Sequence, residues 1–173
     1  MNSLKELYIE ELRDLYDAEN QLLKALPKMA KASSSEELKE AFQSHFEETQ
    51  MHVNRLEQIF EGLEEDPKGK TCKAMKGLIE EGQEVLKIKS GNKHVIDAAL
   101  TAAAQRVEHY EIAGYGCVRT FAHLLGFEDA ATLLRSTLDE EADADKKLTQ
   151  IAEETINMQA AENENEKEEV EVK

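Results

Sequence analysis

The segment AAAQRVEHYEIAGYGCVRTF, at residues 102–121, decides the fold class of this protein. Its apolar residues recur every three or four positions, which is the period of an α-helix that buries one face. Glu111 stands on that apolar face, and Glu108 lies about one turn before it. The pattern extends in both directions, from about residue 94 to residue 125. We therefore expect a long helix that carries charge at the centre of its buried face.

The first helix is predicted to begin at Ser3, which forms a capping box with Glu6, and to run to about Ala32. Its apolar stripe is interrupted at Glu19. Pro27 is expected to kink its last turns.

Two more helices complete the expected set. One follows a cap formed by Ser34 with Glu37 and ends near Gly62. The other begins at about Glu128 and presents Glu141 within its apolar face. Each is joined by a short link to the long helix before it, so each pair should be antiparallel.

The segment between the two hairpins, residues 64–93, is polar and rich in glycine. Apolar residues indicate a short helix within it: Met75, Leu78, Ile79, Val85, Leu86 and Ile88. We predict an all-α, ferritin-like four-helix bundle, in which this crossover joins two antiparallel hairpins, because up-down-up-down bundles use three short loops. The bundle is expected to span residues 1–158, with an acidic C-terminal tail at 159–173.

Composition excludes several classes of function. The net charge of -16, from 37 acidic and 21 basic residues, should repel nucleic acid. No apolar run approaches the roughly 20 residues of a membrane span, and the N-terminus has no signal-peptide pattern. Cys72 and Cys117 match no metal or disulfide motif. We expect a cytoplasmic protein that contacts neither membrane nor nucleic acid.

Every long helix places a carboxylate near its own midpoint. These residues are Glu19, Glu48, Glu108, Glu111 and Glu141. A midpoint keeps its height whichever way a helix points, so the carboxylates should meet in one layer. Buried carboxylates without partners each cost several kcal/mol. The chain has five arginines, of which Arg106 is expected near the layer, so bound metal is the expected counter-charge.

Carboxylate oxygens with histidine suit iron or manganese, with zinc as a further option, at two ions per bundle. His52, one turn after Glu48, is expected to be a ligand, although a spacing of four requires a π-bulge or another ligand geometry. Asp145, one turn after Glu141, stands where a di-iron bundle normally has histidine. The predicted metal ligands are Glu19, Glu48, His52, Glu108, Glu111, Glu141 and Asp145.

Each of these residues also has a simpler structural interpretation. A glutamate in so acidic a chain usually faces solvent, and Glu111 could instead pair with Arg106 or another base. His45 and His109 are most simply hydrogen-bonded or exposed, although either could join the site. The coincidence of carboxylates on four helices is what favours metal.

Four segments together resemble the YciF/YciE family of bacterial ferritin-like proteins, over about residues 3–157. They are LRDLYDAENQLLKALPKMA (12–30), HFEETQMHVNRLEQIF (45–60), AAAQRVEHYEIAGYG (102–116) and LDEEADADKKLTQIAEE (138–154). The resemblance implies a rubrerythrin-like bundle, commonly dimeric and associated with stress responses, with no firmly established reaction. The Glu-x-x-Glu of its third helix is matched by Glu108 and Glu111, its first-helix ligand by Glu19 and its second-helix glutamate by Glu48. Asp145 departs from that pattern, and no rubredoxin segment is present.

We expect a homodimer, from this resemblance and from the apolar residues of the crossover. The first function hypothesis is a di-metal stress protein with iron or manganese redox chemistry on peroxide or oxygen. The alternative is a non-catalytic, stress-induced structural or interaction protein with a degenerate metal site. Iron storage, a third, requires a closed shell of many subunits.

Overall fold

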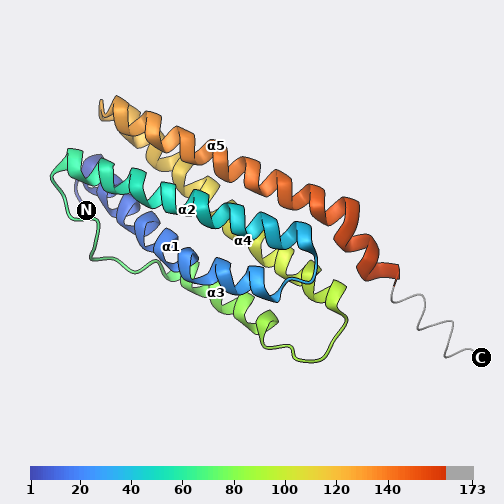
Figure 1. Cartoon of the computed structure of the whole chain (residues 1–173). Helices are drawn as coiled ribbons and strands as arrows, with labels where there is room; N and C mark the ends of the chain where they lie inside the picture. The colour runs from blue at the N-terminus through green and yellow to red at the C-terminus, as the bar shows by residue number, and fades with distance from the viewer. Residues whose placement is uncertain (163–173) are drawn as a thin grey trace, which may run out of the picture.

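The computed structural model describes residues 1–162, and every regular element in this part of the chain is helical (Figure 1). The α-helices are the four long helices α1 (Leu4–Ala32), α2 (Glu36–Leu63), α4 (Lys93–Leu124) and α5 (Glu128–Ile151), and the shorter α3 (Lys73–Leu86). A π-helical turn at Ala152–Ile156 follows α5 and leads into residues 157–162, which are helical again. The predicted all-α class is confirmed.

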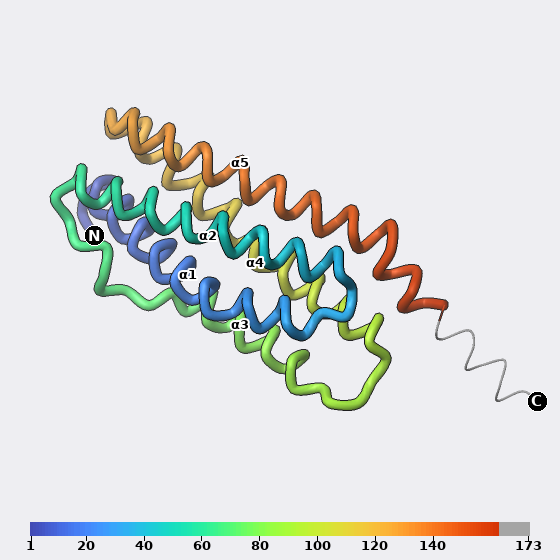
Figure 2. The backbone as a smooth tube through the Cα atoms, in the orientation of Figure 1, coloured from blue at the N-terminus to red at the C-terminus, as the bar shows by residue number. Residues whose placement is uncertain are grey.

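Four of the helices surround one core. α1 and α2 form one antiparallel hairpin, and α4 and α5 form the other (Figure 1). α1 also packs against α4, and α2 against α5. The crossover, which contains α3, passes along the bundle, so α4 runs in the same direction as α2 (Figure 2). This is the predicted ferritin-like connectivity.

The first predicted cap is present, whereas the second is shifted by one residue. The Ser3 side chain accepts a hydrogen bond from the Glu6 N–H. The N-cap of α2 is Ser35, not Ser34, and its hydroxyl accepts from the Leu38 N–H. The Ser34 N–H and hydroxyl donate to the buried carboxylate of Asp97 on α4. A contact between distant helices therefore determines which serine is the cap.

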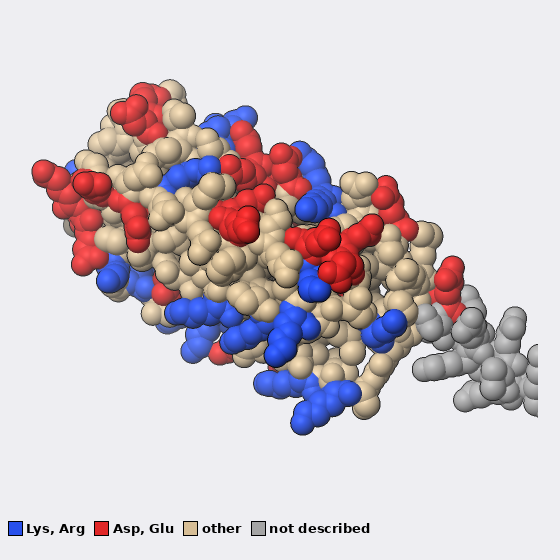
Figure 3. Space-filling view, viewed as in Figure 1, with Lys and Arg blue, Asp and Glu red and all other residues tan. Residues whose placement is uncertain are grey.

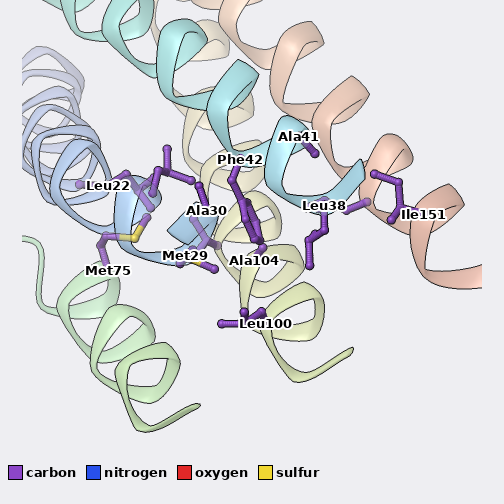
Figure 4. Packing of buried hydrophobic residues seen from close by; sticks show 14 of the residues in the cluster. Leu22, Met29, Ala30, Leu38, Ala41, Phe42, Met75, Leu100, Ala104 and Ile151 are labelled. Atoms are coloured by element: carbon purple, nitrogen blue, oxygen red, sulfur yellow. The ribbon is translucent and has the colours of Figure 1, made fainter. Parts of the chain in front are cut away.

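Two apolar clusters fill the bundle, one on each side of a polar layer. The first contains Leu22 of α1, Phe42 of α2 and Leu100 of α4, and is drawn in Figure 4. The second contains Leu15 of α1 and Leu56 of α2. Each long helix contributes to both clusters and carries polar residues between the two contributions. The sequence argument about helix midpoints is thus borne out in the packing.

Most apolar residues of the crossover pack against the rest of the chain, although Ile88 is 50% exposed. Met75 is fully buried, and Leu78 and Ile79 pack against the first apolar cluster. Met75 is therefore not available to a partner, because α3 lies along α1 and α4, whereas Leu78 and Ile79 are only partly buried. The homodimer stays a prediction.

The C-terminal boundary predicted at residue 158 lies inside a helix, because residues 157–162 are helical. The rest of the predicted acidic tail, residues 163–173, lies outside the described residues. Within residues 1–162, no helix combines the length and the apolar character needed to cross a membrane.

Candidate metal centre

The polar layer contains four glutamates and two histidines, supplied by all four long helices. α1 supplies Glu19, α2 supplies His45 and His52, α4 supplies Glu108 and Glu111, and α5 supplies Glu141. We call these six residues the carboxylate–histidine cluster. None of them is more than 6% exposed.

The cluster has the shape of two ion sites that share one residue. One group consists of His45, Glu108, Glu111 and Glu141, and the other of Glu19, His52 and Glu141. In each group, one donor atom from every residue lies within 4.8 Å of the others. Glu141 belongs to both groups and lies between the two imidazoles, with His52 Nδ1 3.0 Å from its Oε1 and His45 Nε2 3.7 Å from its Oε2.

Helix α2 directs both histidines into the cluster because they are seven residues, or about two helical turns, apart. The buried residues of α2 follow a 3-4-3-4 spacing through Phe42, His45, Thr49, His52 and Leu56. This spacing keeps side chains on one face of a helix. Thr49 occupies the central position of that face, and its hydroxyl donates to the His45 carbonyl. The spacing was a usable signal in the sequence, yet sequence reasoning left His45 open.

Two predicted ligands do not join the cluster. Glu48 lies one position before Thr49, so a rotation of about 100° turns it off the inward face, and its side chain is 35% exposed. Its Oε2 lies 3.3 Å from His45 Nδ1. Asp145 turns toward α4, where its carboxylate contacts Gln105 and His109. His109 itself is 70% exposed. The other five predicted ligands, Glu19, His52, Glu108, Glu111 and Glu141, are brought together.

Contacts with residues outside the cluster orient His52. Its Nε2 lies 2.9 Å from Glu140 Oε2, and Arg55 binds both oxygens of the same carboxylate. A ring nitrogen that donates to a carboxylate leaves the other nitrogen free to accept or to bind metal. His52 therefore presents Nδ1 to Glu19 and Glu141.

Arg55, rather than Arg106, is the arginine beside the layer. Arg106 lies on the exposed face of α4, so the expectation that it lies near the layer was wrong. Both oxygens of Glu111 are buried without a hydrogen-bond partner among the described residues. The alternative in which Glu111 pairs with Arg106 is thereby removed.

Tyr115 closes the cluster on the side of the second apolar cluster. Its hydroxyl donates to Glu19 Oε1, and its ring lies edge-on to the His52 imidazole. The side chain is fully buried. Glu19 is thus held by a neutral donor and keeps its second oxygen, Oε2, without a partner in the described chain.

Burial makes the cluster bind protons strongly when no other cation is present. It raises the pKa of Glu108 and Glu111 well above the usual carboxyl range, and the charge of Glu141 adds to both shifts. Burial works against a charged His52, but contacts with Glu141 and Glu19 outweigh it and raise the pKa of His52 to about 11. The pKa of His45 is also raised, because Glu108 and Glu48 outweigh the effect of burial.

The fold and this cluster define a class of protein: ferritin-like four-helix bundles with a buried layer of carboxylates and histidines. Residues 3–161 match the sequence profile of the family described as "Domain of unknown function (DUF892)". The chain belongs to this family.

Named relatives share both sequence and fold. Protein YciF from Escherichia coli (strain K12) is 48% identical over 162 residues, which cover 92% of this chain and 96% of YciF. The crystal structure of the E. coli stress protein YciF matches with a TM-score of 0.86 at 47% identity, covering 91% of this chain and 99% of that one. YcfI from Rhodopseudomonas palustris, provisionally described as a structural protein, matches with a TM-score of 0.82 at 43% identity, over 86% of this chain and 94% of YcfI.

A structure with much lower sequence identity has the same fold. A protein from Xanthomonas campestris has a TM-score of 0.74 at 20% identity, covering 94% of this chain and 99% of that one. This likeness concerns the fold alone.

The raised pKa values predict how the metal-free protein responds to pH. Groups whose pKa is raised by folding bind more protons in the folded state, so their contribution to stability is present at low pH and is lost as pH rises. For His52 the loss begins near 6.5 and extends to about 11. In the presence of a chelator, the free energy of unfolding in urea should fall by about 1–3 kcal/mol between pH 6.5 and 9. A flat or rising profile would count against a protonated cluster.

Proposed function

We propose that this protein binds two divalent metal ions, iron or manganese, in the carboxylate–histidine cluster. One observation carries the proposal: the cluster holds eight buried side-chain oxygen and nitrogen atoms that have no hydrogen-bond partner among the described residues. Buried polar atoms without partners are rare in folded proteins, and each costs about 1–3 kcal/mol. Atoms in such a position are suited to bind a ligand.

The charge balance of the cluster supports binding of two ions. Four ionised carboxylates carry four negative charges, and two divalent ions carry four positive charges, so neutral imidazoles would leave the cluster without net charge. A buried site is most stable when its charges are balanced in this way. Trivalent ions would need additional negative ligands such as hydroxide.

The donor set supports the identity of the ions. Carboxylate oxygens with one imidazole for each ion suit iron, manganese and zinc, whereas sulfur ligands are absent from the cluster. His45, Glu108 and Glu111 would hold one ion, Glu19 and His52 the other, and Glu141 would serve both. A bound pair of iron or manganese ions would supply redox chemistry toward peroxide or oxygen, with one electron from each ion.

A second candidate function has its own observation in support. Protons can satisfy the cluster without metal, because the two histidines favour their charged forms and Glu108 and Glu111 favour their neutral forms. In that case the protein would be a non-catalytic structural or interaction protein with a degenerate metal site. The provisional description of YcfI as a structural protein is consistent with this function.

Metal content is the direct test. Protein purified without a chelator should contain iron, manganese or zinc at up to about two ions per chain by elemental analysis. After chelation and desalting, it should take up Fe(II) or Mn(II) to the same level. Metal-free protein that also fails this uptake would support the second candidate.

Replacing Glu111 by leucine tests whether Glu111 is a metal ligand, because its effect on stability should differ with and without metal. In a chelator, Glu111→Leu should raise the free energy of unfolding by about 1–3 kcal/mol, because a buried polar group without a partner becomes apolar. With Mn(II) present, the stabilisation gained from metal should shrink, because one ligand is lost. Urea unfolding of both proteins under both conditions measures the difference. Equal loss of stability with and without metal would reject Glu111 as a ligand.

Glu140 is expected to affect the affinity for metal without coordinating the ions. Glu140→Gln removes the charge that orients His52, so the affinity for Mn(II) should fall about 10- to 100-fold, as for other partners of metal-binding histidines. Asp139→Asn is the matched control, since it removes the neighbouring carboxylate, which is exposed and bound to Arg135. Titration of both variants followed by electron paramagnetic resonance measures the change. Equal affinities for the two variants would argue against this role.

A further inference from the structure

A pocket of about 190 Å³ lies between α2 and α5 and leads from the surface to the carboxylate–histidine cluster. Its rim includes the exposed residues Ser44, Asp143 and Lys147. Its floor includes the buried residues His45 and Glu108. We propose that this pocket is the port through which hydrated divalent metal ions reach the cluster, an inference that rests on the proposed function.

The floor of the port presents free donor atoms. His45 is 6% exposed and Glu108 is 2% exposed. The Nε2 atom of His45 and the Oε2 atom of Glu108 have no hydrogen-bond partner among the described residues. An ion inside the pocket would therefore meet one nitrogen and one oxygen donor of the same candidate ion site.

The rim of the port favours cations. Four carboxylates line the pocket, those of Glu48, Glu108, Glu140 and Asp143, against the ammonium of Lys147. Of these, Glu140 is bound by Arg55 and Asp143 pairs with Lys146. In Figure 3, acidic side chains lie over α2 and α5 with some basic side chains among them, whereas basic side chains predominate along the edge formed by α1 and α3. A cleft with a negative rim raises the local concentration of cations and their rate of association. This charge favours metal ions over neutral or anionic substrates as the species admitted.

Packing closes the cluster at both ends and on the α1–α4 side. Apolar clusters cover it above and below, and Glu19 and Glu111 have no exposed surface. On the α1–α4 side, a Cβ atom added to Gly114 would lie only 2.8 Å from Leu15 Cδ2, so the two helices are in close contact there. An ion arriving from that side would have to separate them.

The size of the port fits its proposed occupant. A water molecule occupies about 30 Å³ in the liquid, so the pocket holds roughly six waters or a partly hydrated ion. The space exists because Ala41 and Ala144 line it with small side chains. A larger residue at position 144 should therefore plug the port without removing any donor atom.

The experiment follows Co(II) uptake by the full chain. Metal-free protein is mixed with Co(II) in a stopped-flow instrument, and its visible absorption reports binding. Ala144→Phe should slow uptake at least tenfold and leave the final amount of bound Co(II) unchanged. Ala142→Phe is the matched control, since Ala142 is also half-buried on α5 but does not line the pocket. An equal rate in Ala144→Phe and wild type overturns the port.

A second variant decides the question should Ala144→Phe fail to fold. Lys147→Glu makes the rim more negative and should speed uptake about threefold or more at low ionic strength, an advantage that high salt removes. Lys24→Glu makes the same change of net charge at an exposed site on α1 and should have a smaller effect. Equal effects of the two variants overturn the port. Wild-type protein that binds no Co(II) at equilibrium overturns the proposed function itself, whereas full binding with unaltered rates overturns the port alone.

Discussion

The structure depends on the desolvation of four carboxylates that are held at one height in the bundle. Glu19, Glu108, Glu111 and Glu141 lie in a medium where an unbalanced charge is strongly unfavourable. Protons or metal ions must therefore accompany folding. Two apolar clusters, one on each side, hold the helices at the spacing that keeps these groups together. The free energy of packing in those clusters offsets the cost of the polar layer between them.

Geometry beyond the cluster limits how the carboxylates can be neutralised. Arg55 binds Glu140, and Glu140 in turn binds His52, so the only arginine beside the layer is already engaged at its edge within the described chain. The guanidinium of that arginine hydrogen-bonds Thr137 and Glu140, and it acts on the buried Glu19 only across space. This leaves a small cation or a proton as the species that can enter among the carboxylates, since neither brings a side chain with it.

The pocket between α2 and α5 links the buried chemistry to solvent on one side of the bundle. Helix α5 carries Glu141 inward and Ala144 toward α2, so one helix contributes both the shared donor and the small residue that leaves space beside it. Helix α2 contributes His45 to the floor of the pocket and Glu48 nearer its rim. Helices α1 and α4, which belong to different hairpins, by contrast pack closely enough at Leu15 and Gly114 to close their side.

The helices, their connectivity and the existence of a layer could be predicted from the amino-acid pattern, because helical period and midpoint position are properties of each segment alone. The pattern identified Glu111 and Glu141, which stand squarely on apolar faces. It did not decide between Glu48 and His45, or place Asp145, because one residue turns a side chain by about 100° and only contact with neighbouring helices fixes how each helix is rotated. The same holds for Ser34, whose role depends on Asp97 sixty-three residues away. Arg55 and Glu140 approach His52 only after α2 and α5 have packed, so the tertiary structure alone decided how the centre is oriented.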